Sequence, residues 1–103
     1  MVRPPFGPVV QVFVCTNRRE PSSPLGPGCG DAGQRVYDAL KREVSRRGLV
    51  VSTWITATRC LGVCPSAGCA VARYPGVGLL SEITIEDVAY ILSPAAGGAK
   101  EET

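Results

Sequence analysis

The cysteines constrain this chain more than any other residue type: Cys15, Cys29, Cys60, Cys64 and Cys69 stand in a sequence without a single histidine. The missing imidazole excludes a Ser-His-Asp triad, a Cys-His nucleophile, a Rieske centre and any zinc site with a histidine ligand. Because the sequence shows no secretory signal, we expect a cytoplasmic protein in a reducing compartment. An odd number of cysteines there argues against a disulfide framework and favours metal or redox chemistry.

The length of the chain allows one small hydrophobic core. Its 103 residues, 45% of them hydrophobic and 19% charged, are typical of a single globular domain. We therefore expect one domain over residues 1–103, with loose tails at 1–8 and 94–103. No apolar run approaches the ~20 residues that a membrane-spanning helix needs, so we expect no membrane contact.

Hydrophobic periodicity predicts the element order β-α-β-β-β-α. A helix is expected from Asp31 to Gly48, begun by a capping box of Asp31 with Gln34 and ended by Gly48. A second helix is expected where Thr84 to Asp87 fits the helix-start pattern Ser/Thr-x-x-Asp/Glu. Strands are expected at Val9–Val14, Leu49–Ala57, Ala70–Tyr74 and Leu79–Ile83. This order is typical of a two-layer α/β sandwich, in which helices pack on a mixed sheet.

The topology predicts that four of the thiols converge. The right-handed crossover rule makes the first two strands parallel, so their carboxyl ends meet at one edge of the sheet. Cys15 ends the first strand, and Cys60 and Cys64 follow the second. Cys29 ends a Pro- and Gly-rich loop of about 15 residues and can fold back to the same edge. Four thiolates without an imidazole suit a Cys₄ metal site or an iron–sulfur site.

Other interpretations of the cysteines fit the spacing less well. A Cys₄ zinc site normally shows two close pairs, and here only Cys60 and Cys64 are close. A thioredoxin-type dithiol needs C-x-x-C at a helix N-terminus. Cysteines can also be small buried hydrophobic residues, and this interpretation suits Cys69 best.

Several segments resemble the thioredoxin-like [2Fe-2S] ferredoxins of bacteria, and the resemblance covers roughly Val9 to Leu92. It rests on V-F-V-C followed by an arginine, on C-x₃-C and on a downstream Y-P, within Val12–Arg18, Cys29–Gly30, Thr58–Cys64, Val71–Pro75 and Ile83–Val88. The resemblance implies a thioredoxin-like fold and commonly a homodimer. It also implies a [2Fe-2S] cluster on four thiolates, at positions that correspond to Cys15, Cys29, Cys60 and Cys64.

The resemblance implies a one-electron carrier between larger redox proteins, and not an enzyme. Alternative functions are an iron–sulfur redox sensor or a cluster-bearing interaction module, and a structural Cys₄ zinc domain fits less well. Four thiolates complete both irons of such a cluster, so Cys69 is expected to be a neutral thiol. It would pack against the sheet or lie at the cluster edge, and the rival interpretation is a spare ligand.

The charges are unevenly placed along the chain. The formal net charge of +2 falls to zero when an oxidised [2Fe-2S] core sits on four thiolates, so the sequence does not indicate nucleic-acid binding. Residues 1–59 carry nine Lys/Arg and four Asp/Glu, and residues 60–103 carry two and five. Arg18, Arg19 and Arg59 lie near the expected ligands. They either form a docking rim for an acidic redox partner or simply offset the negative charge of the site.

Overall fold

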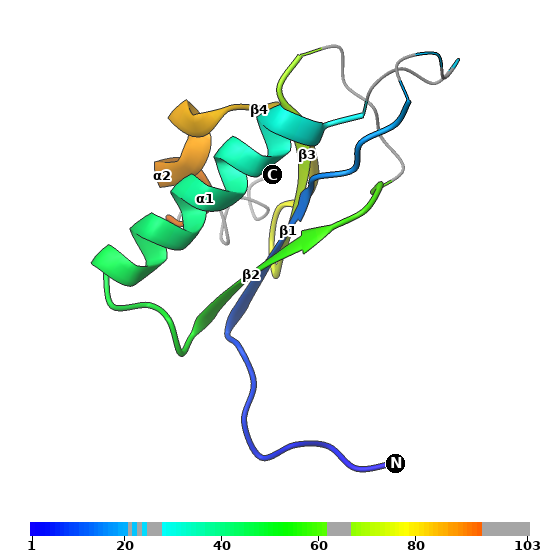
Figure 1. Cartoon of the computed structure of the whole chain (residues 1–103). Coiled ribbons are helices and arrows are strands. Elements are labelled where there is room, and N and C mark those ends of the chain that lie inside the picture. The colour runs from blue at the N-terminus through cyan, green and yellow to red at the C-terminus, as the bar shows by residue number, and fades with distance from the viewer. Residues whose placement is uncertain (21, 23, 25–27, 62–66, 94–103) are drawn as a thin grey trace.

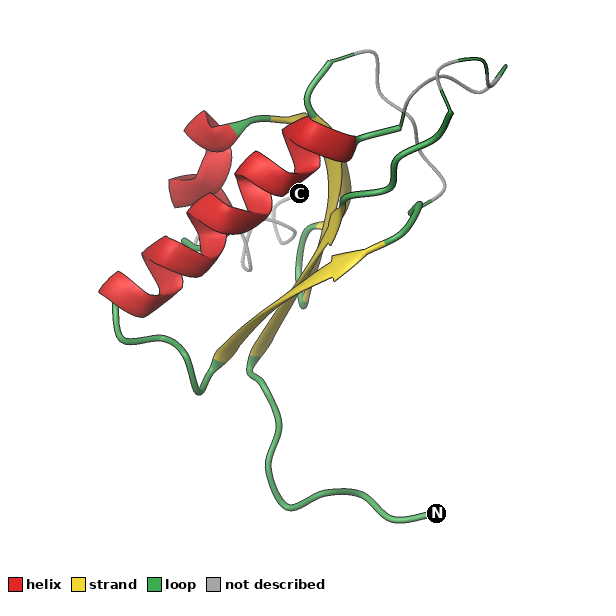
Figure 2. Ribbon diagram, in the orientation of Figure 1, coloured by secondary structure: helices red, strands yellow, loops and turns green. Residues whose placement is uncertain are grey.

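In the part of the chain that the structure describes, the fold consists of one four-stranded sheet with helices on one side of it (Figures 1 and 2). The computed structural model describes residues 1–20, 22, 24, 28–61 and 67–93. Their elements are β1 (Val10–Cys15), α1 (Gly30–Arg46), β2 (Thr53–Thr58), β3 (Cys69–Tyr74), β4 (Gly78–Ile83), the 3₁₀ helix η1 (Ile85–Asp87) and α2 (Val88–Ile91). The strand order is β2-β1-β3-β4; β1 and β2 are parallel, and the other two pairs are antiparallel. The predicted two-layer α/β sandwich with a mixed sheet is therefore confirmed.

Strand β1 lies inside the sheet and carries the core. Val12 and Val14 are fully buried, as expected for a β-branched run that pairs on both sides. Its register with β2 runs from Val10–Thr53 to Cys15–Thr58. The carboxyl ends of these two parallel strands therefore meet at one edge, as the crossover rule predicts.

The second strand is shorter than predicted. We expected it to begin at Leu49, but β2 begins at Thr53. Residues 49–52 form a turn instead, because the N–H groups of Ser52 and Thr53 both donate to the Leu49 carbonyl, at 3.1 and 2.9 Å. The same turn also anchors the start of β1, since the Ser52 carbonyl accepts the Val10 N–H at 3.0 Å.

Helix α1 buries the face that its periodicity predicts, and Val36, Leu40 and Val44 lie in the core. Gly48 follows the helix with φ +71°. Its N–H donates to the Ser45 carbonyl at 3.1 Å, while the next N–H donates to the Val44 carbonyl at 2.9 Å. These two bonds are a Schellman motif, so the predicted helix end at Gly48 is confirmed.

The predicted start of this helix is wrong. Cys29 is the N-cap residue, and its side chain makes no capping hydrogen bond. Asp31 lies inside the first turn and pairs with Arg18, while Gln34 donates to Asp38. The capping-box pattern fails because a long-range partner, distant in sequence, takes the Asp31 carboxylate.

The C-terminal helical segment begins as predicted. The Thr84 hydroxyl accepts the Glu86 N–H at 3.3 Å, and the Asp87 carboxylate accepts the Thr84 N–H at 2.9 Å. This capping box starts η1, which continues into α2. Val88, Ile91 and Leu92 are buried against the core, as expected from their spacing.

Loose tails were expected at both ends of the chain, and the structure describes only the N-terminal one. Residues 1–8 extend away from the sheet before β1 begins (Figure 1). The tail expected at residues 94–103 lies outside the described residues. In the described part of the chain, no helix is both long and apolar enough to cross a bilayer.

A buried arginine, which the sequence did not predict, holds α2 in place. Arg73 in β3 is 4% exposed. Its guanidinium donates to the carbonyls of Ile91 and Pro75, both at 2.7 Å, and to that of Ser93 at 3.5 Å. The carbonyls at the end of a helix lack intrahelical donors and carry partial negative charge. Arg73 therefore supplies both hydrogen bonds and compensating charge at the end of α2.

We expect Arg73→Met to lower the free energy of unfolding by about 2–3 kcal/mol, because it leaves carbonyl groups without their buried donor. Arg73→Lys keeps the charge and part of the bonding, so its loss should be smaller. Urea denaturation followed by circular dichroism measures both variants. Equal stability of Arg73→Met and the wild type would show that solvent replaces these bonds at no cost.

Candidate metal centre

The end of β1 and the start of α1 touch at one glycine. A Cβ atom added at Gly33 would lie 1.9 Å from the Cys15 carbonyl oxygen and 2.9 Å from its carbon. Only a glycine therefore allows α1 to sit this close to the last residue of β1. The Gly33 N–H donates to the carbonyl of Cys29 at 2.8 Å, so this contact positions both thiol-bearing residues.

Cys29 is buried at the junction of α1 and β3. Its Sγ accepts a hydrogen bond from the Ala70 N–H, with an N···S distance of 3.4 Å. The next N–H, of Gly30, donates to the Asn17 carbonyl at 2.9 Å and closes the loop that follows β1. Cys29 is the N-cap residue of α1, so it lies at the end of the helix that carries partial positive charge.

Cys60 stands on the outside of the same edge. The Thr16 N–H donates to the Thr58 carbonyl at 3.0 Å and so extends the β1–β2 pairing beyond Cys15. Cys60 follows two residues after this bond and is exposed. The Arg19 Nη2 donates to its Sγ across 3.5 Å, which links the loop after β1 to the loop after β2.

The structure thus brings Cys15, Cys29 and Cys60 to one edge of the sheet, as the topology predicts. Cys64 lies outside the described residues. Within the described ranges no three His, Cys, Asp or Glu side chains form a group that could hold a metal ion. The four-cysteine ligand set therefore stays a prediction.

Cys69 is the first residue of β3 and is completely buried. Burial, followed by the neighbouring Cys29 and Cys15 thiols, raises the pKa of Cys69 to about 12. Cys69 is therefore a neutral thiol at neutral pH, as the sequence analysis expected. Cys15, Cys29, Cys60 and Cys69 form no disulfide with one another.

Two solved structures are similar to this chain in both fold and sequence. A thioredoxin-like [2Fe-2S] ferredoxin from Aquifex aeolicus is 28% identical, with a TM-score of 0.74, and the match covers 90% of this chain and 84% of that one. A second structure of the wild-type Aquifex ferredoxin is 30% identical, with a TM-score of 0.72, and covers 89% and 90%. The chain belongs to the thioredoxin-like [2Fe-2S] ferredoxin family. No family profile matches the sequence, and no curated protein does.

The donor set of this family member consists of thiols. Thiolates are soft ligands, which favour Cu(I), zinc and iron–sulfur clusters over magnesium or calcium. Cys15 and Cys29 are buried, and Cys60 reaches the surface. The described thiols are therefore of a donor type that suits a soft metal, with Cys15 and Cys29 in the core and Cys60 near solvent.

Arginines surround this edge of the ferredoxin fold. Arg18 pairs with Asp31 of α1, and its guanidinium holds the pKa of that carboxyl below the usual range. Arg19 contacts the Cys60 sulfur, and Arg59 is exposed beside it. The rim of the site thus carries more positive than negative groups.

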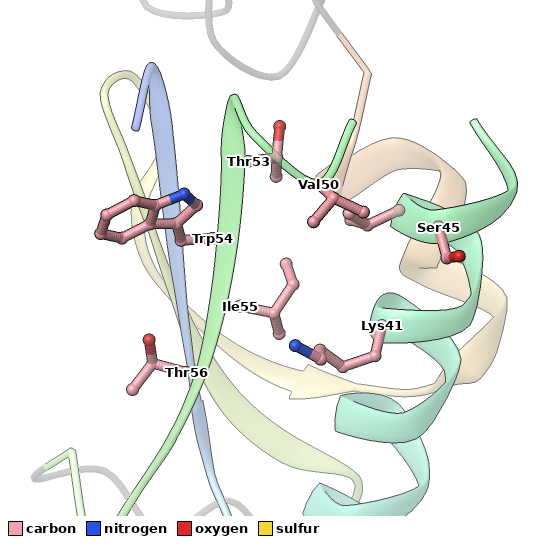
Figure 3. Close-up of a pocket in the computed structure, with 8 residues that line it drawn as sticks. Lys41, Ser45, Val50, Thr53, Trp54, Ile55 and Thr56 are labelled. Atoms are coloured by element: carbon pink, nitrogen blue, oxygen red, sulfur yellow. The ribbon is translucent and has the colours of Figure 1, made fainter. Parts of the chain in front are cut away.

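The cavity shown in Figure 3 is not part of this site. It lies between α1 and the first half of β2, and its lining residues are Lys41, Val44, Ser45, Val50, Thr53, Trp54, Ile55 and Thr56. Lys41 and Ile55 lie on the side of β2 that faces α1, whereas Trp54 points away from the helix (Figure 3). Cys60 follows the opposite end of β2.

The sequence does not predict two of the hydrogen bonds to sulfur. The Ala70 N–H is a backbone group, and no side-chain pattern reveals where it points. The sequence indicates Arg19 only as a charge near the site, because 41 residues separate it from Cys60 and only the fold brings them together. Its position four residues after Cys15 was the one available signal.

We expect Gly33→Ala to lower the free energy of unfolding by about 3 kcal/mol, because its methyl group would overlap a backbone carbonyl that cannot rotate away. Gly48→Ala is the matched control: nothing lies within 4 Å of its Cβ, and only φ +71° opposes it. That strain costs about 1–2 kcal/mol. Urea denaturation compares the two. If Gly33→Ala proves no less stable than Gly48→Ala, the tight contact between α1 and β1 does not exist.

Proposed function

We propose that this chain is a one-electron carrier that holds a [2Fe-2S] cluster on Cys15, Cys29, Cys60 and Cys64. It would act as a single ferredoxin domain and not as an enzyme. The observation that carries the proposal is the likeness to the Aquifex ferredoxin over 90% of this chain, with a TM-score of 0.74. When bound, such a cluster takes up and releases one electron.

The spacing of two cysteines supports the ligand set. Two of the similar solved structures are cysteine-to-serine variants of the Aquifex ferredoxin, at cysteines four positions apart. Cys60 and Cys64 have the same separation in this chain. The other two thiols come from Cys15, at the end of β1, and from Cys29, at the start of α1.

The burial of the thiols suits electron transfer. Cys15 and Cys29 are 1% and 4% exposed, whereas Cys60 is exposed. A cluster held between them would have water excluded on one side and would approach the surface on the other. The protein would set its potential through burial, local charge and hydrogen bonds to sulfur such as the Ala70 N–H.

The arginine rim supports redox partners with acidic docking surfaces. Arg18, Arg19 and Arg59 would attract such a partner to the edge where Cys60 is exposed, and complementary charge raises encounter rates. No disulfide joins the four described cysteines, which is consistent with a reducing compartment, and we propose the cytoplasm.

We propose that a second copy of the chain covers the sheet face opposite the helices. By register, Trp54 of β2 and Tyr74 of β3 flank Gln11 on this face, and Leu79 of β4 lies beside Ala72. Trp54, Tyr74 and Leu79 are 40%, 52% and 48% exposed. None of the five carries a charge, so two such faces meet without like-charge repulsion, and the family resemblance implies a homodimer.

The first experiment is the visible and EPR spectrum of wild-type protein and of single serine variants at Cys15, Cys29, Cys60 and Cys64. We expect a red-brown protein that dithionite bleaches, and loss of most or all of the cluster in each variant, because oxygen binds iron less well than thiolate does here. Cys69→Ser is the matched control and should keep the wild-type spectrum.

Each outcome of that experiment bears on a separate part of the proposal. A colourless protein that binds zinc would contradict the electron-carrier function. Normal spectra in two or more of the four variants would contradict the ligand set. Cluster loss in Cys69→Ser would show that the fourth ligand is Cys69 and not Cys64.

Sedimentation equilibrium tests the dimer. The wild-type chain should have twice the monomer mass of 10.8 kDa at micromolar concentration. Leu79→Glu places a charge on the apolar face, on the edge strand β4, and should give the monomer mass. Val51→Glu, at an exposed position outside the strands, should not. A wild-type monomer, or a dimeric Leu79→Glu variant, would exclude this face as the interface.

A further inference from the structure

We propose that Arg19 is a positioning residue that raises the reduction potential of the cluster through its contact with Cys60. This inference rests on the proposed function, since it requires a cluster on the thiols. Arg19 lies in the loop after β1, and Cys60 follows β2. Their contact is a side-chain hydrogen bond from Nη2 to Sγ at 3.5 Å.

The chemistry of this contact differs from that of a backbone N–H to sulfur. A guanidinium adds a full positive charge to the hydrogen bond, and charge-assisted bonds are stronger than neutral ones. Reduction adds one negative charge to the cluster and its ligands. A cation in contact with a ligand sulfur stabilises this more negative state and therefore raises the potential.

The contact also orders the site. Cys60 and its neighbour Arg59 are both exposed. Arg19 is partly buried, so its side chain is more restrained than a fully exposed one. Arg19 therefore ties the exposed thiol to the loop that connects Cys15 to Cys29.

The adjacent arginine provides a matched control. Arg18 has the same charge and the same side chain, but its guanidinium pairs with Asp31 of α1. Its side chain is 63% exposed. Removing Arg18 therefore changes the net charge near the site equally but breaks no contact to Cys60.

The test measures reduction potentials of holo wild type, Arg19→Gln and Arg18→Gln by dye-mediated titration, at 0.1 M and 1 M salt. We expect Arg19→Gln to lower the equilibrium constant for reduction threefold to tenfold, which is about 28–59 mV for one electron. The shift in Arg18→Gln should be smaller and should vanish at 1 M salt, where the Debye length is about 3 Å. The direct contact of Arg19 should persist there. Resonance Raman bands of the Fe–S(Cys) stretch should change only in Arg19→Gln.

Two results would overturn the inference while the electron-carrier proposal stands: an unshifted potential in Arg19→Gln, or equal shifts in both glutamine variants at 1 M salt. Should Arg19→Gln not retain the cluster, Arg19→Lys and Arg18→Lys decide, because both keep the charge and remove the guanidinium. A change in potential confined to Arg19→Lys supports the contact, and equal potentials in the two lysine variants refute it. A wild-type protein without a [2Fe-2S] spectrum would refute the proposed function and this inference with it.

Discussion

The close approach of helix α1 to the end of strand β1 is the contact on which the rest of the structure depends. The backbone of Gly33 lies against the Cys15 carbonyl where no side chain could fit. This contact brings the core residues Val36 and Leu40 over the sheet. It also places Cys29, the N-cap of the same helix, beside the end of β1. Core packing and thiol placement are therefore one arrangement, and neither can change without the other.

The thiols at this edge differ in burial, and the difference separates their chemistry. Cys69 is deepest, and burial keeps it protonated. Cys15 and Cys29 are buried, and the Cys29 sulfur accepts a hydrogen bond from the Ala70 N–H. Cys60 is exposed and is contacted by a cation. A carrier of single electrons needs this combination, because the redox centre must be protected from water and still reach a partner.

Arginine performs three different tasks in this fold. Arg73 is buried and donates to carbonyls at the end of α2, where no carboxylate is required because the carbonyls supply the negative partial charge. Arg18 is exposed and holds Asp31, a pairing that contributes little free energy at the surface. Arg19 contacts sulfur. One arginine therefore bonds to buried carbonyls, one pairs with a carboxylate at the surface, and one contacts a sulfur. Only their positions in the fold distinguish the three arginines.

Sequence patterns over a few neighbouring residues predict several elements of this fold. Periodicity predicted α1 and its buried face, and the Thr84 capping box predicted the start of the last helical segment. These features depend on residues within a few positions of one another, so the sequence alone contains them. The absence of histidine and the cysteine spacing likewise defined the class of the site.

Tertiary structure decided what depends on residues far apart in the chain. Asp31 did not cap α1 because Arg18 takes its carboxylate. Three hydrogen bonds join residues that are 18 to 41 positions apart. They run from Arg73 to the Ile91 carbonyl, from the Ala70 N–H to the Cys29 sulfur and from Arg19 to the Cys60 sulfur. Such contacts form only when the sheet brings distant strands and loops together. The sequence by itself therefore determined which elements form and which chemistry the thiols can support, and the packing of those elements decided which groups surround each sulfur.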